Sequence, residues 1–78
     1  MKAYIMLNTK PGTSLQAVER IRVKTKGVIA ADAIFGSYDA IVIIEAPTHK
    51  DINNIVYKII EKDPTVTRTQ TFIALDEM

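Results

Sequence analysis

Few side chains in this sequence suit catalysis or metal binding. There is one histidine, His49, and no cysteine, so an ordinary transition-metal site or a thiolate nucleophile lacks its groups. The serines Ser14 and Ser37 stand in no G-x-S-x-G context, and the three glycines form no phosphate-binding loop. The acidic pair Glu61 and Asp63 is interpreted as local surface charge at the end of an element. The sequence therefore predicts a protein that is not an enzyme and has no cofactor and no metal.

One group of polar residues suits the binding of an amino acid. Asp39 offers a carboxylate acceptor, the turn Gly36-Ser37-Tyr38-Asp39 can expose backbone N–H donors, and Thr67, Thr69 and Thr71 offer hydroxyls. A zwitterion needs an acceptor for its ammonium group and donors for its carboxylate close together. The same residues have a structural interpretation, in which Asp39 bonds its own turn and the threonines reflect β propensity. Spacing alone favours that second interpretation.

Length and composition predict one small folded domain over residues 1–78. The chain has 78 residues, of which 47% are hydrophobic, and ten basic against nine acidic side chains leave a net charge of +1. This balance lacks the positive charge that neutralises phosphates, so no direct nucleic-acid binding is expected. No apolar run reaches the roughly 20 residues of a membrane span, and no signal peptide is visible. The absence of cysteine is compatible with a reducing compartment, so a cytoplasmic location is expected.

The hydrophobic periodicity predicts six elements in the order β-α-β-β-α-β. Strands are expected from Lys2 to the Pro11-Gly12 turn, over 28–35, over 40–46 and over 65–75; helices are expected from Thr13 to about Lys24 and from Thr48 to the Asp63-Pro64 stop. Thr13 with Gln16 is typical of a capping box, and Thr48 is a plausible N-cap. The core-facing stripes are Leu15, Val18 and Ile21 in the first helix and Ile52, Ile55, Val56, Ile59 and Ile60 in the second.

This order predicts an α+β fold, the ferredoxin-like βαββαβ sandwich, with an antiparallel four-stranded sheet in the order 4-1-3-2. Right-handed crossovers place both helices on one face of the sheet. The helix-facing residues would be Ala3, Ile5, Leu7, Val42 and Ile44. The open face would carry Tyr4, Met6, Ile41 and Ile43, with Glu45 near its rim. In the fourth strand the facing is ambiguous, and a bulge would resolve it.

The third strand predicts an oligomer. Residues 40–46 are apolar at nearly every position, so this strand presents apolar side chains to both faces of the sheet. Two helices cover only one face. The other face must then meet a second protein chain, and dimerisation through the open sheet face is expected.

Two short motifs resemble the effector domain of the Lrp/AsnC family, also called the RAM domain. Phe35-Gly36-Ser37-Tyr38-Asp39 matches a G-x-x-D turn between strands two and three, and Val66-Thr67-Arg68-Thr69-Gln70-Thr71 matches a V-x-R-T-x-T segment in strand four. The resemblance covers essentially the whole chain. It implies sheet-to-sheet dimers, assembly of dimers into an octamer-like ring, and binding of amino acids or related small molecules between dimers.

Carried over to this sequence, the resemblance implies an effector-binding set of Gly36, Ser37, Tyr38 and Asp39, with Thr69 and Thr71 contributed by a neighbouring subunit. The expected oligomer interface combines the open-face residues Tyr4, Met6, Ile41 and Ile43 with Arg68. Arg68 could pair with the effector carboxylate, but a structural role is favoured. Tyr38 could form a wall of the pocket or pack across the interface between subunits, and the two roles are equally favoured.

The departure from the family concerns DNA binding. Full-length members of the family that this chain resembles carry an N-terminal helix-turn-helix domain, whereas here the first strand begins at Lys2. We therefore expect either a stand-alone sensing module or a chain that has been trimmed to its sensing domain. Such a module would modulate amino acid metabolism or transcription through partners, one route being mixed rings with a full-length Lrp/AsnC regulator. The alternatives are a small enzyme of the dimeric α/β-barrel type, a purely structural oligomerisation domain, and the related ACT domain.

Overall fold

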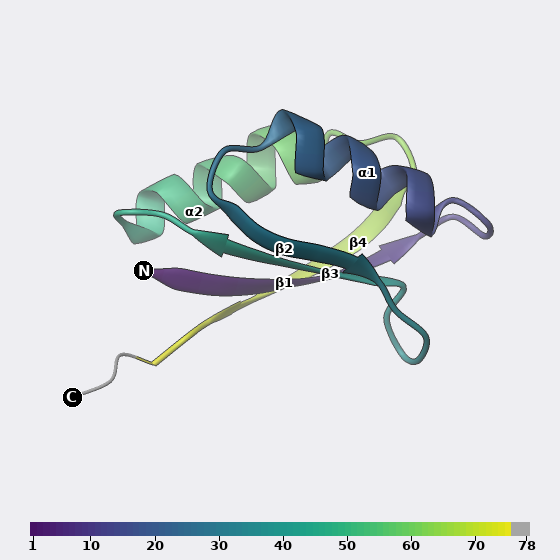
Figure 1. Cartoon of the computed structure of the whole chain (residues 1–78), viewed down its shortest axis with the longest axis horizontal. Coiled ribbons are helices and arrows are strands. Elements are labelled where there is room, and N and C mark those ends of the chain that lie inside the picture. Colours follow the sequence, from purple (N-terminus) through teal and green to yellow (C-terminus); the bar gives the residue numbers. More distant parts are fainter. Residues whose placement is uncertain (76–78) are drawn as a thin grey trace.

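The chain forms seven elements, which a computed structural model describes over residues 1–75. The last three residues of the domain expected over 1–78 lie outside the described part. The elements are β1 (Lys2–Thr9), α1 (Ser14–Lys24), β2 (Val28–Ala33), β3 (Ala40–Glu45), α2 (His49–Ile55), the π-helical turn η1 (Val56–Ile60) and β4 (Val66–Ile73). Since η1 directly continues α2, the predicted order β-α-β-β-α-β is confirmed (Figure 1).

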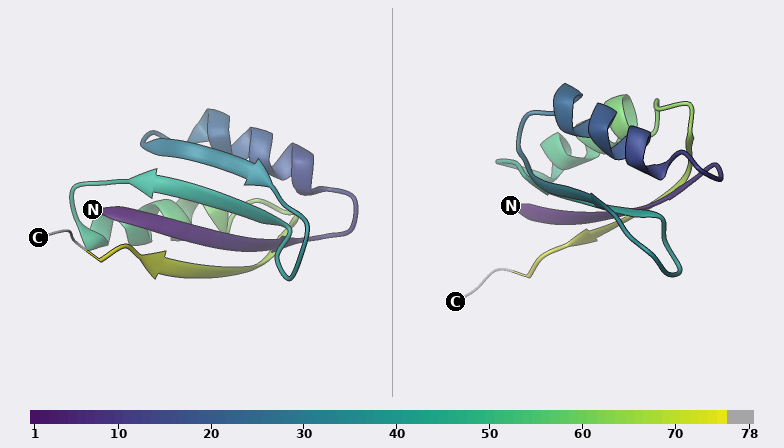
Figure 2. Two further views of the ribbon diagram at one scale, coloured as in Figure 1. Left: turned by 60° about the horizontal axis from the view of Figure 1, so that its bottom comes forward. Right: turned by 45° about the vertical axis from the view of Figure 1, so that its right-hand side comes forward.

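The four strands form one antiparallel sheet in the order β2-β3-β1-β4, which is 4-1-3-2 counted from the other edge. Both helices lie on the same face of the sheet, and the opposite face carries no helix (Figure 1; Figure 2). The register places Ile5 of β1 opposite Val42 on one side and Thr71 on the other. The α+β ferredoxin-like prediction and its strand order are confirmed.

The core lies between the sheet and the helices. All five residues predicted to face the helices, Ala3, Ile5, Leu7, Val42 and Ile44, are fully buried. From the helices, Ile21, Ile52 and Ile60 complete this layer. Full burial of one such aliphatic side chain contributes about 1.5–3 kcal/mol, so this single layer supplies most of the hydrophobic stabilisation of the domain.

The start of α1 differs from the prediction. Thr13 occupies the N-cap position, but its hydroxyl donates to the Lys10 carbonyl at 2.6 Å and caps no helical N–H, so the predicted capping box is wrong. Leu15, expected in the core, is 73% exposed. The buried residues of α1 are Ala17, Val18 and Ile21, and at about 100° per residue this stripe leaves Leu15 to one side, facing solvent.

The second helix begins as predicted and then widens. The Thr48 hydroxyl accepts a hydrogen bond from the Asp51 N–H at 3.1 Å, which confirms the predicted N-cap. At its other end the Glu61 N–H donates to the Val56 carbonyl at 2.8 Å, the five-residue spacing of a π-helix. Of the predicted stripe, the three members Ile52, Val56 and Ile60 are buried, whereas Ile55 and Ile59 are only half-buried.

A bulge resolves the ambiguous facing of the last strand. Asn8 pairs with Arg68 and Thr9 with Val66, which leaves Thr67 as an extra residue in β4. Val66 therefore packs against the core. Beyond the bulge, residues 68, 70 and 72 pair with the open-face positions of β1, and residues 69, 71 and 73 pair with the helix-facing positions.

Candidate functional site

The helix-free face of the sheet carries a continuous apolar surface. Tyr4 pairs with Ile43 and Met6 with Ile41 across β1 and β3, and Phe72 of β4 lies opposite Tyr4 on the other side. We call these five residues the apolar open face. Phe72 is 47% exposed, and the other four are half-buried. The four residues predicted for this face lie on it, and Phe72 extends it.

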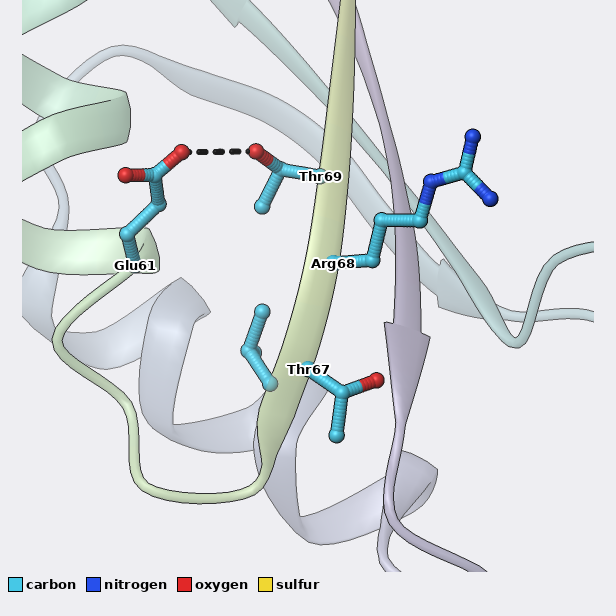
Figure 3. Close-up of a pocket in the computed structure, with 5 residues that line it drawn as sticks. Glu61, Thr67, Arg68 and Thr69 are labelled. Atoms are coloured by element: carbon cyan, nitrogen blue, oxygen red, sulfur yellow. Dashed lines mark hydrogen bonds between the residues drawn. The ribbon is translucent and has the colours of Figure 1, made fainter.

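Charged residues lie at the margins of this face. The Glu45 carboxylate, at the end of β3, accepts a hydrogen bond from the N-terminal ammonium group of Met1 at 2.8 Å. Arg68 pairs with Asn8 at the other end of β1. Figure 3 shows the Arg68 side chain directed away from Glu61 and Thr69. Arg68 therefore lies on the same side of the sheet as the apolar open face.

The hairpin turn Gly36–Asp39 projects on the helix-free side of the sheet (Figure 1). One oxygen of the Asp39 carboxylate accepts hydrogen bonds from the Thr9 N–H at 2.8 Å and, weakly, from the Asn8 amide at 3.5 Å. The Asn8 amide also donates to the Ser37 carbonyl at 3.2 Å. The Asp39 carboxylate thus ties the turn to the end of β1 and accepts no hydrogen bond from the backbone of residues 36–39, unlike the structural interpretation from spacing.

Tyr38 links the turn to the last strand. Its hydroxyl donates to the Gln70 side-chain carbonyl oxygen, although 32 positions separate the two residues in the chain. Because Gln70 pairs with Met6 on the open face, this hydrogen bond places the Tyr38 hydroxyl on the helix-free side of the sheet. Sequence reasoning missed Gln70, whose role depends on a contact that no local pattern reveals.

Thr69 and Thr71 lie on the helix-facing side of β4. The Thr69 hydroxyl donates to the Glu61 carboxylate at 2.8 Å (Figure 3). A groove of about 410 Å³ runs between β4 and the second helix, lined by Asn53, Asn54, Val56, Tyr57, Glu61, Thr69 and Thr71. We call it the β4 groove. A second hollow, of about 320 Å³, lies past Glu61 toward Val66 and Thr67.

The six predicted effector-binding residues therefore do not converge within one protomer. The turn Gly36–Asp39 belongs to the helix-free side, and Thr69 and Thr71 belong to the helix-facing side. Glu61 joins the threonines, and sequence reasoning missed it because it was interpreted as surface charge. The available signal was its position at the end of the second helix, just before the chain returns into β4.

An ion pair with a buried carboxylate holds the segment between Glu61 and β4. The Asp63 side chain is 4% exposed and accepts two hydrogen bonds from the Arg20 guanidinium, at 2.8 and 3.0 Å. The Thr65 N–H and hydroxyl also donate to it, at 2.9 and 2.6 Å. The guanidinium, more than any other group, holds the pKa of Asp63 well below its usual range. The interpretation of Asp63 as surface charge is wrong.

Within 1–75, no three His, Cys, Asp or Glu side chains lie close enough together to bind a metal ion. His49 is exposed at the first position of α2, as expected for a helix-start residue. No helix in the same range is long and apolar enough to cross a membrane.

The fold defines an α+β domain of the ferredoxin-like class with one sheet face uncovered. The family model of the Lrp/AsnC ligand binding domain matches residues 2–78, and the chain belongs to that family. It is an effector-domain module of a regulatory family rather than a member of an enzyme family. No curated protein matches the sequence.

Solved structures agree with this assignment. FFRP-DM1 is 31% identical with a TM-score of 0.87, the match covering 95% of this chain and 97% of the other. The hypothetical protein PHS023 from Pyrococcus horikoshii is 32% identical with a TM-score of 0.88, covering 97% and 90%. AsnC of E. coli, 16% identical, shares the fold with a TM-score of 0.87; 97% of this chain matches 51% of AsnC, about half its length.

Proposed function

We propose that this chain is a non-enzymatic sensing module that binds an amino acid between associated subunits. The observation that carries the proposal is the separation of the six candidate residues onto two sides of the sheet. A site that uses both the Gly36–Asp39 turn and the threonines of β4 needs residues from two protomers. Ligand binding and association are then one linked equilibrium.

The apolar open face supports dimerisation of the chain. Its five residues form one uninterrupted surface over β1, β3 and β4 with no helix above it. Apolar surface removed from water contributes about 25 cal/mol per Å². A second copy related by a two-fold axis offers the same surface in return. In the proposed assembly such dimers join into a ring, with Arg68 in a structural role at the subunit contacts.

The ligand is proposed from the chemistry of the turn and of the β4 groove. The volume of the groove, about 410 Å³, lies in the range of small-molecule sites. The structure of NMB0573 from Neisseria meningitidis, a transcriptional regulator, is of its complex with L-methionine; it is 15% identical to this chain with a TM-score of 0.83. An amino acid is therefore the class of effector that we propose here.

The signal would be a change in assembly. A ligand held between dimers stabilises the assembled state only by its higher affinity for that state. A full-length regulator of the same family is the proposed partner, because an open sheet face that accepts its own copy can accept a similar sheet. The chain would then influence transcription without contacting DNA itself.

The test is calorimetry and analytical ultracentrifugation of the chain with each of the twenty protein amino acids. We expect at least one of them to bind with saturable heat and to shift the mass distribution toward larger assemblies. If none binds and the mass distribution never changes, the sensing function is refuted. A ring that forms and remains indifferent to every amino acid would instead support the purely structural alternative.

A further inference from the structure

An amino acid carries an ammonium group, which needs an acceptor close to the donors that bind its carboxylate. The Asp39 Oδ2 atom accepts the Thr9 N–H at 2.8 Å and the Asn8 amide at 3.5 Å, and these bonds fix the turn to β1 on the helix-free side of the sheet. Thr69 and Thr71 lie on the helix-facing side. If the proposed function holds, a head group bound by these threonines needs an acceptor on their own side of the sheet.

Glu61 is such an acceptor. It is the one acidic residue among the described residues that line the β4 groove. Its Oε2 atom accepts the Thr69 hydroxyl at 2.8 Å, which orients the carboxylate toward β4 (Figure 3). Within residues 1–75, Oε1 accepts no hydrogen bond. A carboxylate that is held in one orientation through Oε2 and has Oε1 available can bind an ammonium group through charge-assisted hydrogen bonds.

Donors for a carboxylate lie at the free edge of β4, the outermost strand (Figure 2). In an antiparallel pair, alternate residues direct both backbone groups toward the partner strand. The Ala74 N–H donates to the Lys2 carbonyl at 2.8 Å, so Ala74 and every second residue before it face β1. Thr69 and Thr71 therefore direct their backbone N–H groups outward, beside the β4 groove and Glu61.

We propose that the β4 groove recognises the head group of the amino acid. Glu61 accepts the ammonium group, and the outward N–H groups of Thr69 and Thr71, together with the Thr71 hydroxyl, donate to the carboxylate. The amino acid side chain then extends along Tyr57, which is 68% exposed. The turn Gly36–Asp39 of a neighbouring protomer closes the site and does not bind the ammonium group.

The test rests on the proposed function and compares Glu61→Gln with Glu19→Gln. Both variants remove one negative charge, but Glu19 is an exposed residue of α1 that pairs with Arg22. Glutamine at position 61 can still accept the Thr69 hydroxyl, so the fold is retained, and a thermal melt checks this. Calorimetry uses each amino acid that binds the wild type, together with its N-acetyl derivative and its amide.

We expect Glu61→Gln to weaken binding of the free amino acid at least tenfold and Glu19→Gln to leave it unchanged. The N-acetyl derivative, which has no ammonium group, should bind weakly and equally to wild type and Glu61→Gln. The amide should bind weakly to all three proteins. If Glu61→Gln binds the free amino acid as the wild type does, the role of Glu61 is overturned while the sensing function stands. Failure of the wild type to bind any amino acid refutes both.

Discussion

Replacing Asp63 by asparagine should destabilise the fold far more than an ordinary substitution in a connecting segment. The wild-type carboxylate accepts two hydrogen bonds from Arg20 and two from Thr65, with the side chain only 4% exposed. Asparagine keeps the size but loses the charge and one acceptor oxygen, which leaves the guanidinium without its bidentate partner. The Asp63 carboxylate is buried, but the Arg20 side chain is 37% exposed, so breaking this pair costs about 2–3 kcal/mol, at the low end for a buried charged pair. For a domain of this size that lowers Tm by roughly 10–25 °C.

Urea unfolding followed by circular dichroism at one fixed protomer concentration measures this change. The fixed concentration is needed because association would itself contribute to the measured stability. Glu19→Gln is the control, since it breaks the exposed pair with Arg22 and should change the free energy of unfolding little. A loss for Asp63→Asn no larger than that for Glu19→Gln would refute the reasoning.

The same variant gives a prediction about pH. The pKa of Asp63 is lowered in the folded state, chiefly by Arg20, so the stability it contributes is present above the ordinary carboxyl pKa of about 4. Below that pH the unfolded chain takes up a proton that the folded chain does not. The difference in unfolding free energy between wild type and Asp63→Asn should therefore be constant near neutral pH and shrink as the pH falls below about 4. A difference that grows in acid contradicts the assignment.

Two further substitutions test local features of the fold. Gly27→Ala should destabilise the fold by about 2–4 kcal/mol, because Gly27 has φ of +87° and a Cβ would lie 2.6 Å from the Glu45 carbonyl oxygen. The control is Gly12→Ala, which should cost only about 1 kcal/mol, because Gly12 has φ of +77° and no atom within 4 Å of the added Cβ. Equal losses of unfolding free energy in chemical denaturation would contradict the clash at Gly27. Thr48→Ala removes the acceptor of the Asp51 N–H and should cost about 1 kcal/mol, a loss that Thr48→Ser should largely restore in thermal melts.

The sheet could be predicted from the sequence because its determinants are local and periodic. Ala3, Ile5 and Leu7 alternate with Tyr4 and Met6, and this period of two fixes which side chains are buried. The strand order followed from the handedness of the crossovers. A bulge in β4 was also considered, because the alternation along that strand left its facing ambiguous, but its position was not predicted.

The features that sequence reasoning missed depend on tertiary contacts. Asp63 was interpreted as surface charge because its partner Arg20 lies 43 positions earlier in the chain. Glu61 was dismissed for the same reason, since its contact with Thr69 exists only once β4 packs beside the second helix. The π-helical turn that begins at Val56 follows no local signal either.

The helix-free sheet face is the feature on which the account of function depends. Ile41 belongs to the apolar open face, where it lies opposite Met6 and is half-buried, whereas Val23 is 80% exposed on α1. Lysine is tolerated by the fold at either position, because neither belongs to the buried layer between sheet and helices. Ile41→Lys and Val23→Lys are therefore a matched pair.

Sedimentation equilibrium of the wild type and these two variants over a hundredfold range of concentration tests the claim most directly. We predict that the wild type and Val23→Lys sediment as dimers or larger assemblies, and that Ile41→Lys dissociates to monomers at concentrations where the other two remain associated. A wild-type chain that stays monomeric and folded at the highest concentration would contradict the account.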